Sequence, residues 1–503
     1  MNELNNIYNF KNNIRYFVNI SDLNYTMVIT NINYLSWTTP ISVRLKKKTN
    51  DNTISRLIKM PNILNFYACF SIMKNKEKFY DISTISDHSR MTAQIETGDF
   101  KKNSYSSQIQ SDFLKLSLYD FVLKMDIKSF YDGIYTHDIK FNDSFNDRYI
   151  ANLNEGKTNG IILGSYISLY VAECYLKKIS EELEREIESK NINCFFEYFS
   201  DDFYFFCNKE DVDIIKNLFS SVLYSFSLER NEDKDLLLDY FEYSELNKID
   251  KCWKKIEYQN TAKNPKLPKR HFYLNHLISY KGKIKDNKLY YTFIIGFYKS
   301  KYFYKLEEYP YYKLEQSNIH QILILYKDYP EIILFSINKY IKDKLFLSTS
   351  KEFIEKYYQK SLMLPFFENQ LYYFYALILL NDYSFLKKPS IIQLVLNSNN
   401  QILLSYYVKN KLFEGDLKQY LKNSEEFWFF NYNLLCSLFE NNDIEESELD
   451  ELIDKLIPKN CKKDIQKENY RKFYKTNIKE NHYLVYDVDK IYSQIKHYIE
   501  LRK

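Results

Sequence analysis

The chain has 503 residues, of which 45% are hydrophobic. This length is sufficient for two or three domains, and this hydrophobic content can fill their cores, so the composition excludes a disordered chain. The formal net charge of +4 is too small to indicate a nucleic-acid-binding protein by itself. The local basic run Arg44, Lys46, Lys47 and Lys48 is compatible with a phosphate-facing patch and, equally, with a solvated loop.

The cysteines and the apolar runs bear on the compartment. The 7 cysteines are odd in number and scattered without a C-x-x-C pair, which disfavours a disulfide framework and a zinc site. No apolar run approaches the ~20 residues that a membrane span requires. We therefore expect a soluble, cytoplasmic protein without a membrane partner.

Three regions follow one another along the chain. Residues 1–115 combine short apolar segments with basic stretches, and the segment from Arg56 to Asn62 lies directly before a helical pattern. Residues 116–250 carry the densest strand and loop patterns. Residues 251–503 are rich in Tyr and Leu at helical spacing, which predicts an all-α region in which helical repeats are an open alternative.

The first candidate catalytic acid ends an apolar run. Residues 121–126 read Phe-Val-Leu-Lys-Met-Asp and are followed by Ile127 and, soon after, by Phe130 and Tyr131. This pattern predicts a core strand that carries the carboxylate of Asp126 to a cleft.

Two further acids lie inside an aromatic run. Asp201 and Asp202 interrupt residues 194–206, a segment that predicts a β-hairpin. Burial of ionised carboxylates is costly unless a bound cation compensates them, and divalent metal ions are the usual compensation for a group of acids. The alternative is a hairpin turn in which both acids face water.

A glycine loop and a lysine accompany these acids. Gly160 and Gly164 lie four residues apart before a predicted helix over residues 169–189, in a chain that has only 8 glycines. Their spacing indicates a close approach of the backbone to another group, or simply a loop with a helix N-cap at Ser165. Lys234, in Asn231-Glu-Asp-Lys234, is spaced to return to the same cleft, although an exposed lysine is the simpler interpretation.

Together these motifs resemble a known family. Asp126-x-x-x-Phe-Tyr131, the Gly160 to Ser168 loop, Phe199-Ser-Asp201-Asp202 and Asn231-x-x-Lys234 are similar, in this order, to motifs A to D of reverse transcriptases. The Thr-x-Gly-Ile start of the loop and Lys59-Met-Pro-Asn62 resemble the bacterial abortive-infection (Abi) reverse-transcriptase-like polymerases. The resemblance implies an α+β fold: right-hand polymerase fingers within residues 1–115, a palm within residues 116–250, and the α-helical domain within residues 251–503.

The resemblance also implies an activity and its partners. It implies nucleotidyl transfer from dNTPs by two Mg²⁺ ions, with Mn²⁺ as a substitute, in phage defence by abortive infection. It implies template-independent synthesis of single-stranded DNA that starts on a protein tyrosine and stays covalently attached to it, in a homo-oligomer. The metal ligands would be Asp126, Ile127, Asp201 and Asp202.

Substrate contacts are carried over from the same family. Arg56 and Lys59 from the fingers, and Lys234 behind the palm, are candidate partners of the triphosphate, with Lys234 also a candidate proton donor to pyrophosphate. Tyr131 is the expected steric gate against the ribose 2′-OH, or else a core residue. Gly160 and Gly164 would approach the substrate.

The priming tyrosine is predicted from mobility. Chain ends are the most mobile segments, and the Asn pairs around Tyr8 predict poor structure there, so Tyr8 is preferred over Tyr16, Tyr25 and Tyr34. An ordinary anchoring aromatic in a terminal helix is the alternative for Tyr8.

Other functions remain open from the sequence. A templated reverse transcriptase of the retron or group II intron kind would use the same acids. Arg270 and His276 match the spacing of a HEPN-type RNase, a single short match. An inactive palm that serves as a scaffold is disfavoured by the intact acids.

Overall fold

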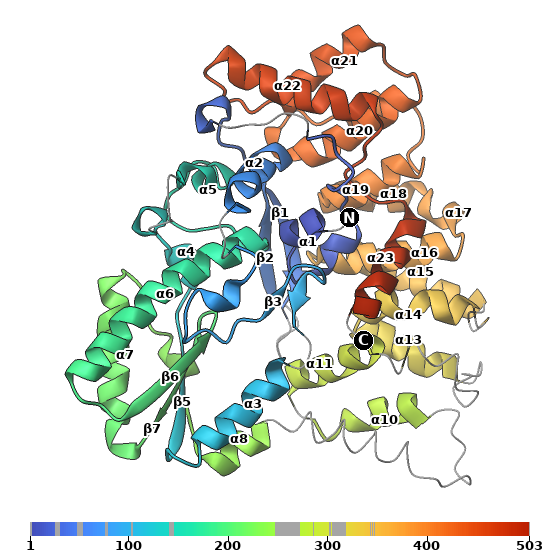
Figure 1. Cartoon of the computed structure of the whole chain (residues 1–503). Coiled ribbons are helices and arrows are strands. Elements are labelled where there is room, and N and C mark those ends of the chain that lie inside the picture. Colours follow the sequence, from blue (N-terminus) through green and yellow to red (C-terminus); the bar gives the residue numbers. More distant parts are fainter. Residues whose placement is uncertain are drawn as a thin grey trace.

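The computed structural model describes most of the chain and leaves several segments undescribed. It describes residues 3–25, 31–47, 54–75, 79–101, 104–139, 145–246, 272–284, 286–300, 303, 318–342, 344, 346 and 348–501. The basic residue Lys48 and the RNase candidate Arg270 lie outside these ranges. The fold is mixed, with a sheet-containing N-terminal half and a helical C-terminal region (Figure 1).

The first region contains two small antiparallel ribbons and three helices. Its strands pair in register as β1 with β2 and β3 with β4. Asn62 caps the helix that follows β2, and its side chain accepts a hydrogen bond from the Leu64 amide at 3.1 Å, so the helix predicted there is confirmed. The elements are α1 (Glu3–Tyr8), the 3₁₀ turn η1 (Asn13–Tyr16), β1 (Ile41–Lys46), β2 (Ser55–Met60), α2 (Ile63–Met73), β3 (Ala93–Gln94), β4 (Asp99–Phe100) and α3 (Ser104–Lys115).

A four-stranded antiparallel sheet forms the second region. Its strand order is β6-β7-β5-β8, so the β6–β7 hairpin lies beside the strand that ends in Asp126. Residues alternate between the two faces of a strand. The elements are β5 (Phe121–Asp126), α4 (Phe130–Gly133), α5 (Arg148–Leu153), α6 (Tyr166–Ser189), β6 (Cys194–Phe199), β7 (Asp202–Cys207), α7 (Val212–Ser225), the 3₁₀ turn η6 (Glu232–Lys234), β8 (Leu236–Leu238) and α8 (Tyr240–Leu246).

Helices cover both faces of this sheet (Figure 1). One face packs on α6 and α7 in the main hydrophobic core, where the ring of Phe203 lies 4.9 Å from that of Phe219. The far end of the opposite face packs on α3 and α8 in a small cluster that includes Val122 and Phe206. The end of the sheet that carries the acids is left outside this small cluster.

The C-terminal region is helical in all its described elements, as the sequence predicts. The helices are α10 (Phe272–Tyr280), α11 (Asn287–Tyr298), α13 (Ile319–Asp328), α14 (Glu331–Lys342), α15 (Ser348–Leu362), α16 (Phe367–Leu379), α17 (Tyr383–Leu386), α18 (Pro389–Ser398), α19 (Gln401–Lys409), α20 (Trp428–Glu440), α21 (Glu446–Ile453), α22 (Asp464–Lys479) and α23 (Val488–Leu501). Several helices pack on the next one in the chain, such as α15 on α16 and α19 on α20, whereas α14 packs on α16 and α23 packs back on α14.

The N-terminal segment joins this helical region to the sheet. Val18 forms an isolated bridge with Val485, and the Tyr406 hydroxyl donates to the Phe17 carbonyl at 2.9 Å. One continuous hydrophobic cluster includes residues from all three predicted regions. The domain boundaries near residues 115 and 250 therefore stay a prediction.

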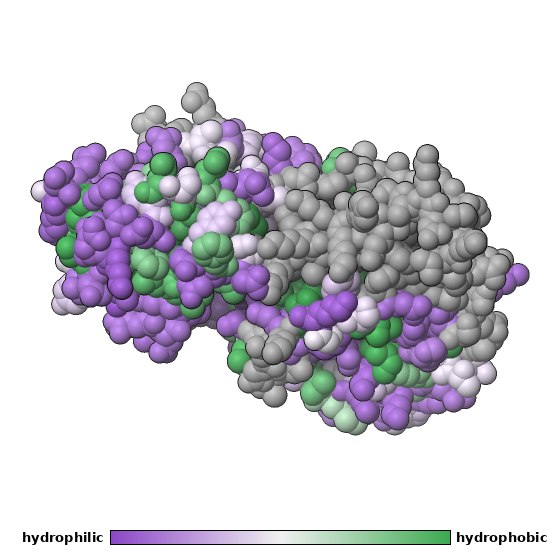
Figure 2. Space-filling view, turned by 90° about the horizontal axis from the view of Figure 1, so that it is seen from below, coloured by the Kyte–Doolittle hydropathy of each residue, from purple (hydrophilic) through white to green (hydrophobic). Residues whose placement is uncertain are grey.

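The surface of the described residues is mostly hydrophilic, with hydrophobic residues interspersed, when the molecule is viewed from below (Figure 2). Leu114 of α3 and Phe241 of α8 are among the exposed hydrophobic side chains. Within the described residues no helix is long and apolar enough to cross a membrane.

Candidate active site

The three predicted acids lie together at one end of the four-stranded sheet. Asp126 is the last residue of β5 and pairs across the ladder with Asp202, the first residue of β7. Residues directly opposite each other in an antiparallel pair project to the same face, so these two carboxylates are neighbours. Asp126 is only 4% exposed, while Asp202 is half-buried. The predicted strand and its carboxylate are confirmed as structural features.

The third acid occupies the hairpin turn. Ser200 and Asp201 connect β6 to β7, and Ser200 adopts a left-handed φ of 55°. The Ile127 amide donates to the Asp201 carbonyl at 3.1 Å, which fixes the turn against the end of β5. The predicted hairpin is therefore confirmed, with Asp201 half-buried rather than freely solvated.

The electrostatics of the turn show an excess of negative charge. Burial raises the pKa of Asp201, and the neighbouring carboxylates of Asp202 and Asp126 raise that pKa further. Like charges that share a site disfavour ionisation of one another. A cation at this place would relieve that repulsion.

Asp126 already has close donors from the segment after α7. The Lys234 ammonium lies 2.8 Å from each carboxylate oxygen of Asp126. The Asn231 side chain donates to Asp126 Oδ1 at 2.9 Å, and the Asn231 amide donates to the Asp126 carbonyl at 2.8 Å. The structure thus brings Lys234 back to the acids, where its ammonium pairs with the Asp126 carboxylate.

The glycine loop approaches two neighbouring segments closely. Gly160 has a φ of +81°, and a Cβ there would lie 3.2 Å from the Asp132 carbonyl oxygen. Gly164 has a φ of +128°, and a Cβ there would lie 3.2 Å from the Cβ of Ile58 in β2. Left-handed backbone with so little space requires glycine.

Hydrogen bonds hold the same loop in place. The Ile161 amide donates to the Tyr131 carbonyl at 2.9 Å, and the Lys59 amide donates to the Leu163 carbonyl at 3.1 Å. Ser165 then caps α6, because its hydroxyl accepts from the Ser168 amide at 3.2 Å. The loop therefore approaches neighbouring chain segments closely and also begins a capped helix, while its approach to a substrate stays a prediction.

Tyr131 lies near Asp201 and near Arg56 of β2. Burial raises the pKa of its phenol, and the charge of Asp201 raises that pKa further, whereas Ser200 and Arg56 lower it. These mutual effects place Tyr131 beside the hairpin turn and bring Arg56, an exposed residue of β2, towards the same site.

Lys59 has a different partner. Its ammonium donates to Asn154 Oδ1 at 3.1 Å, next to Glu155. The predicted contact of Lys59 with a triphosphate stays a prediction. In this structure its ammonium pairs with Asn154 instead.

The prediction that the segment around Tyr8 is poorly structured is wrong. Tyr8 lies in α1 and is 1% exposed, its hydroxyl donates to the Pro61 carbonyl at 2.5 Å, and its ring lies 4.7 Å from that of Phe66. Asn5 and Asn6 are buried as well, and they hold backbone groups, for example the Ile20 amide at 2.7 Å from Asn5 Oδ1. Tyr8 is an anchoring aromatic in a terminal helix.

The sequence interpretation missed a charged layer behind the acids. Lys124 of β5 shares a face with Asp126 and Asp202, and burial lowers the pKa of its ammonium. Arg90 lies nearby and donates to Asp112 at 2.5 Å and to Glu197 at 2.9 Å, almost fully buried. The available signals were charged residues within apolar strand runs, namely Lys124 in β5 and Glu197 in β6.

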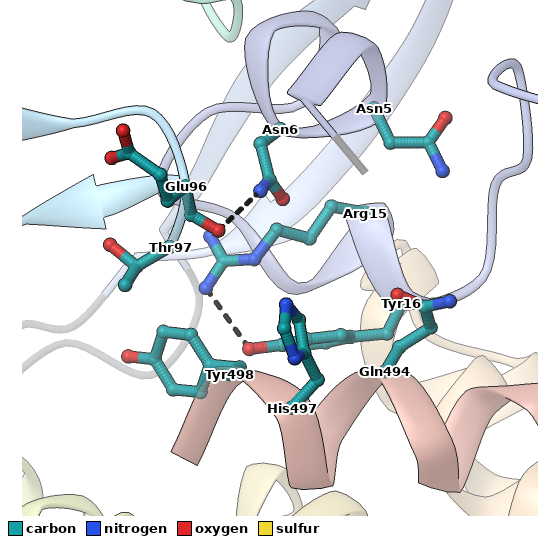
Figure 3. A pocket seen from close by; sticks show the side chains of 9 residues that line it. All are labelled: Asn5, Asn6, Arg15, Tyr16, Glu96, Thr97, Gln494, His497 and Tyr498. Carbon is teal, nitrogen blue, oxygen red and sulfur yellow. Dashed lines mark hydrogen bonds between the residues drawn. The ribbon is translucent and has the colours of Figure 1, made fainter. Parts of the chain in front are cut away.

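A small pocket lies elsewhere, between the N-terminal segment, the 95–98 turn and α23 (Figure 3). Arg15 crosses it, donating to the Gly98 carbonyl at 2.7 Å and to the Tyr16 hydroxyl at 3.0 Å. The charge also rests against the ring of Tyr498, whose hydroxyl donates to Asp99 at 2.8 Å. These contacts connect the N-terminal segment, the 95–98 turn and α23, and the pocket is not part of the acid site.

The arrangement and the chemistry of the three acids both bear on metal binding. As the side chains lie, no group of three acids, histidines or cysteines in the described residues is gathered around one point. The donor set nevertheless fits a hard divalent cation, which prefers carboxylate oxygens. The adjacency of Asp126 to Asp202, with Asp201 in the hairpin turn beside them, is the structural reason for this fit.

Comparisons with known proteins give little further information. The chain matches no protein-family model and no curated protein. Among solved structures it is similar to telomerase from Candida albicans in complex with a TWJ fragment of telomeric RNA, at 12% identity and a TM-score of 0.27. The match covers 65% of this chain and 62% of that chain, so it spans less than two thirds of the telomerase chain. This TM-score is too low to assign a fold.

Proposed function

We propose that this chain is a reverse-transcriptase-like nucleotidyl transferase that extends DNA from dNTPs. The observation that supports this proposal most directly is the arrangement of the three acids. Asp126 ends a strand, Asp202 pairs with it, and Asp201 occupies the hairpin turn beside both. This arrangement brings together residues that are distant in sequence, as the motif resemblance expects.

Each group around the acids then has a role in the proposed reaction. Asp126, Asp201 and Asp202 would hold Mg²⁺, with the main chain of Ile127 beside them, and the bound ions would neutralise charge on the transferring phosphoryl group. Arg56 approaches from β2 and would contact the triphosphate. Tyr131, fixed by the Ile161 amide, would exclude the ribose 2′-OH.

The finer parts of the proposal rest on the Abi resemblance. We infer that synthesis starts on a tyrosine hydroxyl of a homo-oligomeric protein and needs no template, in phage defence. A tyrosine is a chemically suitable nucleophile for the first in-line displacement. We do not propose Tyr8 as that primer, because its buried hydroxyl donates a hydrogen bond to the Pro61 carbonyl.

A template-dependence experiment separates this proposal from its nearest rival. Purified protein is incubated with labelled dNTPs and Mg²⁺, with and without a primed RNA template, and products are resolved on a denaturing protein gel. Label that migrates with the protein without template supports protein-primed, template-independent synthesis. Free DNA that appears only with template supports a templated reverse transcriptase, and no incorporation under either condition contradicts both.

A further inference from the structure

The Asp126 carboxylate accepts hydrogen bonds from two side chains. Its two oxygens accept from the Lys234 ammonium at 2.8 Å each, and one of them also accepts from the Asn231 amide group at 2.9 Å. The Asp126 side chain is 6% exposed, so these contacts replace its hydration. An ionised carboxylate so deeply buried requires such partners.

The Lys234 ammonium can move away from Asp126 without disturbing the core. The Lys234 side chain is 55% exposed and extends from η6, a single 3₁₀ turn at the surface. Release of its ammonium therefore exposes no hydrophobic core. The Asn231 amide donates to the Asp126 carbonyl, so the backbone contact holds this turn against β5 even when the ammonium moves away.

A divalent cation and this ammonium require the same oxygens. Hard cations bind carboxylate oxygens directly, at shorter distances than a hydrogen bond. Two positive charges on one carboxylate repel each other, and the ammonium contacts both oxygens of Asp126. The two therefore compete for this carboxylate.

We propose that Lys234 is a built-in counter-ion of Asp126 that a divalent cation displaces. In the cation-free protein the ammonium pairs with the buried carboxylate and holds it in place. Cation binding releases the ammonium, which then becomes available to the phosphates of an incoming nucleotide. This second step rests on the proposed function, whereas the competition itself does not.

The test measures cation binding without nucleotide. Thermal unfolding is followed as MnCl₂ is titrated into the full-length protein, the Lys234→Met variant, which keeps the length of the side chain without its charge, and the Lys234→Arg variant, which keeps the charge. Lys128→Met is the matched control, since Lys128 joins the same two segments through an exposed pair with Glu229 at 3.2 Å.

The expected signature has two parts. Lys234→Met lowers the unfolding temperature without cation, because Asp126 loses its partner, and lowers the half-saturating Mn²⁺ concentration by about tenfold. Lys234→Arg and Lys128→Met retain the wild-type half-saturation. Asp126→Asn abolishes the Mn²⁺-dependent rise.

Two outcomes overturn the inference. Equal or weaker Mn²⁺ binding by Lys234→Met contradicts the competition, and so does the absence of Mn²⁺ stabilisation in both wild type and Lys234→Met. The proposed function fails separately, since a protein that shows the signature but incorporates no dNTP would retain the counter-ion exchange without polymerase activity.

Discussion

The two faces of the four-stranded sheet have opposite chemistry although the same strands form both. On the α6 and α7 side, Leu123, Met125, Phe203 and Phe205 are at most 1% exposed and belong to the main core. On the other side, alternate residues of the same strands give Lys124, Asp126 and Asp202 towards the acid-bearing end, and Val122 and Phe206 in the small apolar cluster at the far end. One-residue alternation therefore separates the packing of the sheet from its chemistry.

The difference shows where charge can be retained in this fold. The charged face keeps its ions by pairing, as Arg90 does with Asp112 and Glu197, and Lys234 with Asp126. The strand side chains of the apolar face carry no charge, the Tyr198 phenol is a polar group among them, and this face depends on close packing. Variants of the two faces should therefore fail in different ways.

The largest expected effect is on the charged face. Asp126→Asn and Asp201→Asn should each lower dNTP incorporation by about 1,000-fold or more, because metal-ion catalysis contributes several kcal/mol to such reactions. Circular dichroism should remain near wild type in both variants, and the unfolding transition of Asp201→Asn should not fall, since Asp201 is repelled by the neighbouring carboxylates. Substantial activity in Asp201→Asn, measured on folded protein, would contradict the assignment.

Substitutions on the apolar face should lower stability and leave the activity of the folded protein unchanged. Phe205 is fully buried and its ring lies 5.5 Å from that of Phe219. Phe205→Ala should lower the free energy of unfolding by about 3–5 kcal/mol. Phe205→Leu should cost less and leave the activity per folded molecule unchanged. Loss of activity in a well-folded Phe205→Leu protein would show that the two faces are not separable.

Sequence reasoning succeeded where local pattern determines local structure. The apolar run ending at Asp126, the hairpin around Asp201 and the helix after Gly164 all depend on alternation, turn chemistry and capping, and all are present. Partners set by tertiary contact were not predictable in the same way. The spacing of the motif predicted that Lys234 lies near the acids, but it could not show that its ammonium pairs with the Asp126 carboxylate.

Tyr8 shows why the N-terminal prediction failed. Asparagine favours turns and exposed segments in general. Here the neighbouring asparagines are buried, and Asn6 donates to the Ile95 and Glu96 carbonyls at 2.9 Å each. Their amide groups satisfy backbone groups of remote segments, and a single sequence does not reveal those segments.

A smaller effect is expected at the border between the faces, where Tyr131 lies beside the hairpin turn. Tyr131→Val should raise incorporation of rNTPs relative to dNTPs by about 10- to 100-fold, because steric exclusion of one hydroxyl is a modest discrimination. Competition assays with mixed nucleotides would measure this ratio. Tyr135→Val, at an exposed tyrosine nearby, is the control. An unchanged ratio in Tyr131→Val would make Tyr131 a packing residue only.

The last expected effect concerns Glu173, a carboxyl group buried on the apolar side. Glu173 of α6 is fully buried, and burial raises the pKa of its carboxyl to about 8, although a hydrogen bond donated by Ser89 at 2.9 Å and the nearby Tyr198 phenol lower that pKa.

The pH dependence of stability follows from this raised pKa. Between the ordinary glutamate pKa of about 4.3 and the folded value, the folded protein retains a proton that the unfolded chain has lost. The free energy of unfolding should therefore fall as pH rises through this window, by at most about 1.36 kcal/mol per pH unit, and level off above pH 8.

Glu173→Gln removes this titration and keeps the shape of the protonated side chain. The variant should be more stable than wild type at pH 8.5, and its advantage should shrink steadily towards pH 6, because wild-type Glu173 is then protonated in the folded state. Unfolding temperatures measured across this range would follow the difference. Glu181→Gln, at an exposed residue of the same helix that pairs with Lys177 at 3.7 Å, should show no such trend. An advantage of Glu173→Gln that is constant with pH would mean that Glu173 is not protonated in the folded protein, and the apolar side would then hold an ion as the charged side does.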